Sequence, residues 1–367
     1  MERRGIGWSA SAESISSLCR EIASRELEFL APALLVVLGF VVISVLVFRK
    51  FWVRQSLASD LSVKICLAVS SLAILSLVIE ILMYGFHSES VGWPGNITGR
   101  RWFCEHWHPI NDLGYRDEGT TRLFDKHTVV VLGDSFAAGH GVEDYRDRFS
   151  NRLEGLLGSD WAVANVARLG WHTADQQRGL AEFPYDPEIV VISYYVNDIM
   201  GVAPQRQMPG TGKSKSWPPP LQYLVDHSTL WNYASLKAGR FRSKKGPRNS
   251  RFQKIVDAFD DPATWARHER ELRSLISQVR SKGAQPIVVT WPYTRDVERT
   301  APLTGRVADL MRTADVPVID LADHFAGREP AELMASSMDG HPSRGLHEEV
   351  AELLYERLRS IDRGYNE

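Results

Sequence analysis

The sequence predicts an α/β domain with a parallel β-sheet covered by helices on both faces, preceded by two transmembrane helices. Strand-like and helix-like stretches alternate from Thr128 onward, which is typical of a parallel sheet. The runs Ile189–Ile192 and Ile287–Thr290 are continuous rather than alternating, as in strands buried on both faces. Two long apolar runs lie before residue 87, and 367 residues suffice for one large domain with accessories.

The composition excludes some partners. Charged residues make up 24% of the chain and hydrophobic residues 44%, and the net charge of -2 gives no overall attraction to nucleic acid. The three cysteines are widely spaced and odd in number, so neither a disulfide framework nor a cysteine-based zinc site is indicated. We therefore expect no nucleic-acid partner, no metal and no cofactor.

The two apolar runs predict a transmembrane hairpin over residues 29–86. Residues 29–48 carry no charge, and residues 65–86 carry one, Glu80. About 20 apolar residues cross a bilayer, so each run is long enough. A pair of buried core helices is the alternative, but such helices seldom stay apolar on all sides for this length. For Glu80, we favour a place near the outer interface, or a protonated side chain, over a functional role.

The basic residues between the runs predict the orientation. They are Arg49, Lys50, Arg54 and Lys64. Residues 87–96 contain no Lys or Arg, so the positive-inside rule places the short loop in the cytoplasm. The polar tail, residues 1–28, and everything after Phe86 then lie outside, although Arg20 and Arg25 of the tail argue mildly against this. We expect a protein of the bacterial inner membrane with an extracytoplasmic domain.

The predicted elements follow a connector, residues 87–126, and form a domain at 127–362. The strand-like runs are Thr128–Leu132, Trp161–Val166, Glu188–Tyr195, Gln285–Trp291 and Val316–Leu321. The helix-like stretches are Arg148–Leu157, Thr173–Phe183, Pro262–Lys282, Leu303–Thr313 and His347–Ile361. In the connector, Cys104, His106 and His108 match no standard metal spacing, so we favour an aromatic-rich packing segment over a metal site.

Residues 201–251 interrupt the alternation after the third strand. They hold three consecutive prolines and a basic cluster that consists of Arg240, Arg242, Lys244, Lys245, Arg248 and Arg251. One interpretation is a solvated, partly disordered loop, and the other is a lid over the carboxyl edge of the sheet or over anionic lipid. The sequence favours neither.

Ser135 is the candidate nucleophile. The apolar run Val129–Leu132 stops at Gly133-Asp134-Ser135, which delivers the hydroxyl to the carboxyl edge of the sheet, where open α/β sheets bind ligands. A serine attacks only when a base removes its proton. Asp134 is predicted to cap the following turn.

Two further strand ends supply donors for an oxyanion. Gly170 follows the second strand, and a glycine lets its backbone N–H approach a substrate closely. Asn197 ends the third strand, and its side-chain amide can donate to the same oxyanion. With the backbone N–H of Ser135, they form the predicted oxyanion hole.

His341 is the candidate base, and Asp339 is the carboxylate that would orient it. His341 precedes the last helix, and Pro342 restricts the local backbone. His140 and His172 lie near proposed catalytic elements and are competing bases. We treat both as candidates for substrate contact or packing.

Gly133-Asp134-Ser135, Gly170, Asn197 and the Asp339–His341 pair occur in an order that resembles the SGNH (GDSL) hydrolase superfamily. The likeness covers roughly residues 110–362, and Asn111–Arg116 resembles a lead-in of bacterial membrane-anchored members. It implies a flavodoxin-like three-layer α/β/α fold with a five-stranded sheet, and the site roles given above. In one departure, Met338 stands where the family has its usual Asp, three residues before the histidine.

We therefore expect a membrane-anchored serine esterase that hydrolyses O-acyl esters, in particular O-acetyl esters, on an extracytoplasmic substrate such as an acylated envelope glycan. One alternative is an O-acyltransferase that passes the acyl group from the same site to a glycan hydroxyl. Another is a non-catalytic glycan-binding or scaffold module on the same fold. The sequence identifies no protein partner.

Overall fold

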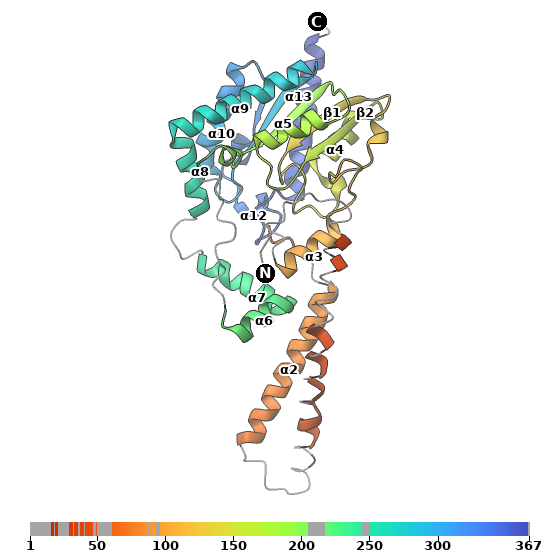
Figure 1. Cartoon of the computed structure of the whole chain (residues 1–367), viewed down its shortest axis with the longest axis vertical. Helices are drawn as coiled ribbons and strands as arrows, with labels where there is room; N and C mark the ends of the chain where they lie inside the picture. The colour runs from red at the N-terminus through yellow and green to blue at the C-terminus, as the bar shows by residue number, and fades with distance from the viewer. Residues whose placement is uncertain are drawn as a thin grey trace.

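A five-stranded parallel β-sheet forms the core of the α/β domain in the computed structural model (Figure 1). The structure describes residues 16–17, 19–20, 29–31, 33–35, 37–39, 41–46, 49, 61–86, 89–92, 96–204, 217–243 and 250–365. The strands are β1 (His127–Gly133), β2 (Trp161–Ala167), β3 (Ile189–Tyr195), β4 (Gln285–Trp291) and β5 (Val318–Asp320). Their order, β2-β1-β3-β4-β5, confirms the predicted flavodoxin-like sheet.

The register places the carboxyl ends of β2, β1 and β3 at the same edge of the sheet. Gly133, the last residue of β1, pairs with Ala167 of β2 and with Ser193 of β3. The apolar side chains of β1 are fully buried, which explains why its sequence is continuous rather than alternating. The strand order reverses between β1 and β3, which is where ligands bind in such folds.

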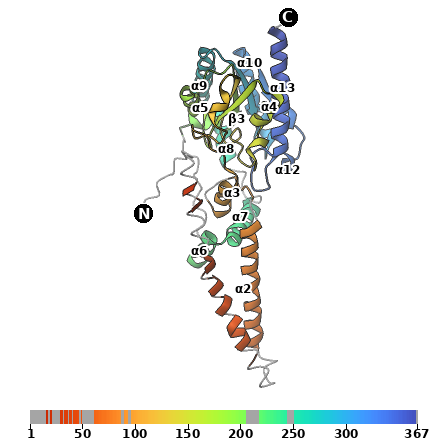
Figure 2. The ribbon, with the colours of Figure 1, turned by 90° about the vertical axis from the view of Figure 1, so that its right-hand side faces the viewer.

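Helices cover both faces of the sheet (Figure 2). α4 (Phe149–Leu157) and α13 (Arg344–Tyr365) pack together on one face, and α5 (Thr173–Glu182) and α9 (Pro262–Ser281) pack together on the other. α10 (Val297–Thr313) packs on β4 and β5, and starts six residues earlier than predicted because Asp296 caps it. The shorter elements of the domain are η1 (Thr120–Leu123), η2 (Tyr145–Asp147), η3 (Asp198–Gly201), α11 (Leu321–Phe325) and α12 (Pro330–Leu333).

Two apolar helices extend away from the sheet side by side (Figures 1 and 2). One is α2 (Leu61–Phe86), and the other comprises the described residues between 29 and 46. The windows Phe29–Leu46 and Leu67–Tyr84 have mean hydropathies of 2.8 and 2.2, and they have the length and composition of membrane spans. Ser44 Oγ donates a hydrogen bond of 2.8 Å to Ser70 Oγ between the two helices. The structure does not describe residues 1–15 or Arg25 of the tail. The same holds for Lys50 and Arg54 of the loop.

The segment that interrupts the alternation is largely helical where it is described. It forms α6 (Pro219–His227), α7 (Thr229–Ser243) and α8 (Ser250–Asp260), so of the two interpretations the solvated, partly disordered loop is wrong for these residues. α7 packs on α2 and on α3 (Ile97–His106). The side chains of the predicted basic cluster lie outside the described set.

Glu80 of α2 caps the amino end of α7. Its carboxylate, 6% exposed, accepts hydrogen bonds from Ser228 Oγ (2.6 Å), Thr229 N (2.6 Å) and Leu230 N (3.0 Å). The first N–H groups of a helix have no partner within it, so a carboxylate is well suited to this place. Glu80 therefore has a structural role as a helix cap, which the sequence did not indicate.

Cys19 and Cys104 form a disulfide with a Cα–Cα distance of 5.6 Å. The expectation of no disulfide is wrong, because 85 residues separate the two cysteines and an odd total conceals the pair. Cys104 belongs to α3, whose Trp102 and Phe103 are buried in the core. This supports the packing interpretation of the connector over a metal site at Cys104.

Candidate active site

Ser135 lies two residues beyond the end of β1, on a turn that is fixed on both sides. Asp134 Oδ1 accepts a hydrogen bond of 2.9 Å from Phe136 N, which confirms the predicted capping role of Asp134. The carbonyl of Ser135 accepts 2.9 Å from His140 N. Phe136 stacks on Tyr195 with ring centroids 3.9 Å apart. The Ser135 side chain is half-buried at the sheet edge.

A hydrogen-bonded chain joins Ser135, His341 and Asp339. His341 Nε2 lies 2.9 Å from Ser135 Oγ, and its Nδ1 lies 2.5 Å from Asp339 Oδ1. The backbone N–H of His341 also donates to Asp339 Oδ1, at 3.0 Å. An antiparallel bridge between Met334 and Pro342 closes the loop that carries both residues. Asp339, two residues before the histidine, thus reaches the imidazole although Met338 occupies the family's usual position.

The Asp339 carboxylate is completely buried. Burial by itself raises the pKa of Asp339, but the imidazoles of His341 and His140 and the hydrogen bonds from His341 and Ser90 hold this pKa well below its ordinary value. The carboxylate is therefore ionised at neutral pH and carries the charge that a base-orienting group needs.

His140 packs directly against His341. It is 2% exposed, its ring centroid lies 4.2 Å from that of His341, and Trp102 and Phe103 of α3 surround it. Burial, assisted by the neighbouring His341, lowers the pKa of His140 to about 3, so its ring is neutral at ordinary pH. This geometry favours the packing role that the sequence left open.

His140, Asp339 and His341 are also the one metal-type cluster among the described residues. Their potential ligand atoms lie within 4.8 Å of one another. His341 Nδ1 and Asp339 Oδ1 already contact each other at 2.5 Å, and His341 Nε2 faces Ser135. Because two of the three potential ligands, His341 and Asp339, are engaged in the hydrogen-bonded chain, we assign no metal to this site.

Gly170 and Asn197 stand at the same sheet edge as Ser135. Gly170 lies three residues beyond β2 and Asn197 two beyond β3, the two strands that flank β1. Gly170 is exposed and has φ +74°, a left-handed conformation that favours glycine. Asn197 is 5% exposed and precedes η3, whose Asp198 accepts a hydrogen bond from Gln176 at 3.1 Å. Their roles as oxyanion donors stay predictions.

His172, the other competing base, is the N-cap residue that directly precedes α5. Its backbone N–H donates to Asp175 Oδ2 at 3.1 Å, and its Nδ1 lies 4.0 Å from Asp198 Oδ1. The Cα of Gly201 in η3 faces this ring so closely that an added Cβ would meet His172 Cβ at 2.9 Å. His172 therefore joins the turns after β2 and β3, whereas His341 contacts the serine.

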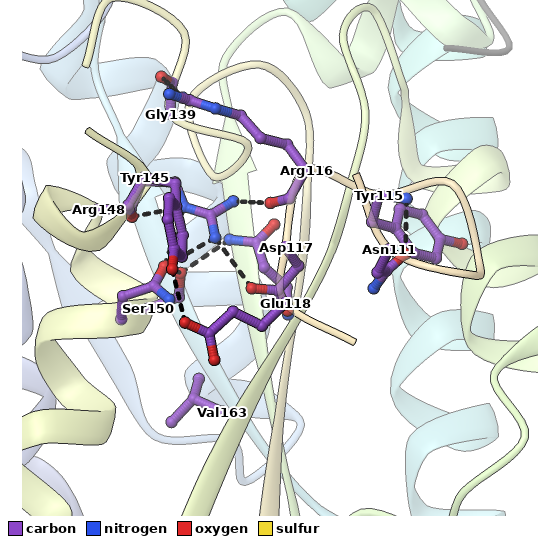
Figure 3. Close-up of polar contacts among 12 residues, drawn as sticks. Asn111, Tyr115, Arg116, Asp117, Glu118, Gly139, Tyr145, Arg148, Ser150 and Val163 are labelled. Atoms are coloured by element: carbon purple, nitrogen blue, oxygen red, sulfur yellow. Dashed lines mark hydrogen bonds and ion pairs between the residues drawn. The ribbon is translucent and has the colours of Figure 1, made fainter. Parts of the chain in front are cut away.

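The Asn111–Arg116 segment supports the turn that follows the nucleophile (Figure 3). Asn111 Oδ1 accepts from Leu113 N (3.1 Å) and Tyr115 N (2.9 Å), which folds the segment back on itself. The guanidinium of Arg116, 2% exposed, donates to five backbone carbonyls. They belong to His106 (2.7 Å), Ala138 (3.5 Å), Gly139 (2.7 Å), Val142 (2.9 Å) and Glu143 (3.0 Å).

Asp117 and Arg148 extend this support and carried no signal in the sequence. Arg148, completely buried, donates to Asp117 Oδ1 at 3.0 Å and to the carbonyl of Arg116 (Figure 3). Asp117 Oδ2 accepts from Asn165 N at 2.9 Å, and Asn165 Nδ2 donates to the carbonyl of Ala137 at 2.8 Å. These hydrogen bonds connect Arg116 to the backbone of Ala137, two residues after Ser135, and so support the turn that carries Ser135.

A five-stranded sheet of this order, with a serine after its first strand and a histidine before its last helix, defines the SGNH class of hydrolases. A model of the GDSL-like lipase/acylhydrolase family matches residues 131–348. The chain belongs to this family, and the resemblance that the sequence motifs indicated is confirmed.

Solved structures of related fold were also found. A lipase/acylhydrolase from Enterococcus faecalis is 17% identical, with a TM-score of 0.41, over 64% of this chain and 96% of that one. Est24, a carbohydrate acetylesterase from Sinorhizobium meliloti, is 11% identical, with a TM-score of 0.38, over 64% of this chain and 100% of that one. Axe2, an acetylxylan esterase from Geobacillus stearothermophilus, is 16% identical, with a TM-score of 0.38, over 63% of this chain and 93% of that one. A search of curated proteins found no match.

Proposed function

We propose that this protein is a membrane-anchored serine esterase that cleaves O-acyl esters outside the cytoplasm. The observation that carries the proposal is the hydrogen-bonded chain from Ser135 through His341 to the buried carboxylate of Asp339. The three groups have the residue types, order and distances that nucleophilic catalysis requires. Membership of the GDSL-like family supports an ester as substrate.

In the proposed mechanism, Ser135 Oγ attacks the acyl carbonyl while His341 Nε2 takes its proton. The oxyanion accepts hydrogen bonds from the backbone N–H groups of Ser135 and Gly170 and from the Asn197 amide. The tetrahedral intermediate then collapses, and His341 returns the proton to the departing alkoxide. Water repeats the sequence on the acyl-serine, which releases the acid and regenerates Ser135.

The membrane location rests on the two apolar helices and on the disulfide. Cys19 precedes both candidate spans and Cys104 follows both, so a chain that crosses twice returns the second cysteine to the side of the first. Disulfides persist in oxidising compartments, which favours the extracytoplasmic side for the tail and for the α/β domain. An O-acetylated glycan of the envelope is the substrate that this location suggests.

The activity is tested with the full-length protein in detergent and p-nitrophenyl esters of two to eight carbons. We expect hydrolysis that is fastest for acetate and that falls more than about 1,000-fold in Ser135→Ala. Asn197→Ala should lower kcat about 100- to 1,000-fold. Equal rates for wild type and Ser135→Ala would leave a non-catalytic module, and a preference for octanoate would refute the acetyl assignment.

The topology is tested separately with reporter fusions at residues 55 and 120. We expect a cytoplasmic reporter at 55 and an extracytoplasmic one at 120. A cytoplasmic residue 120 would remove the basis for an envelope substrate, while leaving the esterase proposal intact.

A further inference from the structure

The segment that leaves α2 packs against the loop that carries Asp339 and His341. Ser90, four residues beyond the end of α2, is 5% exposed. Its carbonyl accepts a hydrogen bond of 2.8 Å from Ser336 Oγ, and the same hydroxyl accepts 3.1 Å from Asp339 N. The connector and the catalytic loop thus share one polar network, although 249 residues separate Ser90 from Asp339.

The two oxygens of Asp339 have different partners. Oδ1 accepts both hydrogen bonds from His341, one from the ring and one from the backbone. Oδ2 accepts from Ser90 Oγ, which is its one hydrogen-bond donor among the residues described here. His140 Nε2 lies 3.9 Å from Oδ2, which is beyond hydrogen-bonding distance. A buried carboxylate oxygen without a hydrogen-bond donor costs free energy, and no other described side chain donates to Oδ2. Ser90 therefore supplies the hydrogen bond that this oxygen requires.

The backbone beside Ser90 is shaped for this approach. Gly92 has φ +74°, and a Cβ on it would lie 3.0 Å from Asp339 Oδ1. A larger residue would adopt this conformation only with strain, and it would press on the oxygen that contacts His341. Glycine is therefore required for the connector to pass this close to the carboxylate.

We propose that Ser90 is a positioning residue of the active site: it holds Asp339 Oδ2, so that Oδ1 stays aligned with His341 Nδ1. This inference deepens the proposed esterase function and rests on it. Ser90 belongs to the connector that follows the apolar hairpin, so the segment that leaves the proposed membrane anchor supplies a positioning residue of the site.

A second contact between anchor and catalytic loop runs through α7. Glu80 of α2 caps this helix, and Tyr233 OH donates to Glu89 Oε2 at 2.7 Å. Lys237 Nζ donates to Ser337 Oγ at 3.2 Å, two residues before Asp339. The catalytic loop is thus in contact with the connector and with α7, both of which are attached to α2.

The test compares Ser90→Ala and Ser90→Thr in the full-length protein in detergent. Ser90→Ala removes the donor, and Ser90→Thr keeps the hydroxyl. For Ser90→Ala we expect kcat for p-nitrophenyl acetate to fall about 10- to 100-fold, the factor that loss of one hydrogen bond to a charged group produces. KM should stay within about threefold, because Ser90 is buried and its hydroxyl contacts Asp339. Ser90→Thr should recover most of kcat.

Two controls separate this role from a general structural one. Ser159→Ala removes an exposed serine that bonds only its neighbour Asp160, and should leave kcat unchanged. Rates are divided by the active-site concentration found with a fluorophosphonate that titrates Ser135, so misfolded protein lowers the titre and not kcat. Gly92→Ala should lower kcat as Ser90→Ala does.

The outcomes are distinct. If Ser90→Ala keeps kcat within twofold of wild type while Ser135→Ala is inactive, the positioning role fails and the esterase proposal stands. The role also fails if Ser90→Thr loses as much kcat per titrated site as Ser90→Ala. If Ser135→Ala is as active as wild type, the proposed function fails first.

Discussion

Replacing Arg116 by lysine tests whether the Asn111–Arg116 segment supports the nucleophile turn as strongly as its contacts indicate. The arginine donates to five backbone carbonyls, whereas an ammonium has three donors, so at least two of these contacts are lost. A hydrogen bond from a charged group contributes about 1.5 to 3 kcal/mol, so Arg116→Lys should lower the free energy of unfolding by about 3 to 6 kcal/mol.

For a domain of this size, that loss lowers the melting temperature by about 6 to 24 °C. The assay is thermal unfolding of the full-length protein in detergent, with Arg146→Lys as a matched control. The Arg146 side chain is 71% exposed, so its replacement should change the free energy by less than about 0.5 kcal/mol. Equal shifts for the two variants would refute the support that we assign to Arg116.

Three further predictions concern pH and helix capping. Burial lowers the pKa values of His140, His268 and His347 to about 3, so their contribution to stability is present above pH 6.5 and lost as the pH falls toward 3. In that pH range the free energy of unfolding should drop by about 4 kcal/mol per pH unit. A flat pH profile in denaturant titrations would contradict this. Burial and the nearby Asp134 raise the pKa of Asp198, so its ionisation destabilises the fold when the pH is above the ordinary pKa of an aspartate. Asp198→Asn should therefore have a higher melting temperature than wild type at pH 8 but not at pH 4. Glu80→Ala should weaken the cap of α7 by about 1 to 2 kcal/mol and speed hydrogen exchange of the α7 amides about 5- to 30-fold; unchanged exchange would show that the cap is dispensable.

The sheet and the proposed catalytic residues were predictable because their signals are local. A strand buried on both faces needs a continuous apolar run, and β1 and β3 have such runs. Ser135 and His341 are reactive residue types placed next to elements that the sequence already identifies. Asp339 was predictable because a residue two positions before the histidine reaches the imidazole in an extended turn.

The residues that support the site were harder to find, because their contacts join distant parts of the chain. Ser90 and Glu80 meet their partners across 249 and about 150 residues, and a serine or a glutamate alone indicates nothing. The Cys19–Cys104 pair was missed because three widely spaced cysteines did not indicate a disulfide framework. The insertion was predicted as a loop or lid because its prolines and charges conceal α6 and α7, which are stabilised by packing on other helices rather than by their own pattern.

The contacts of α2 bear on the anchor that we propose, because they reach the loop that carries the candidate catalytic residues. A plain tether needs a flexible connector and no polar contact with the domain. Here the connector is buried at Ser90, and its hydroxyl reaches the carboxylate that contacts His341. Glu80, six residues before the end of α2, also caps α7. Lys237 of α7 contacts the same loop. Release of the α/β domain from these helices would therefore remove the contacts that Ser90 and α7 make around Asp339.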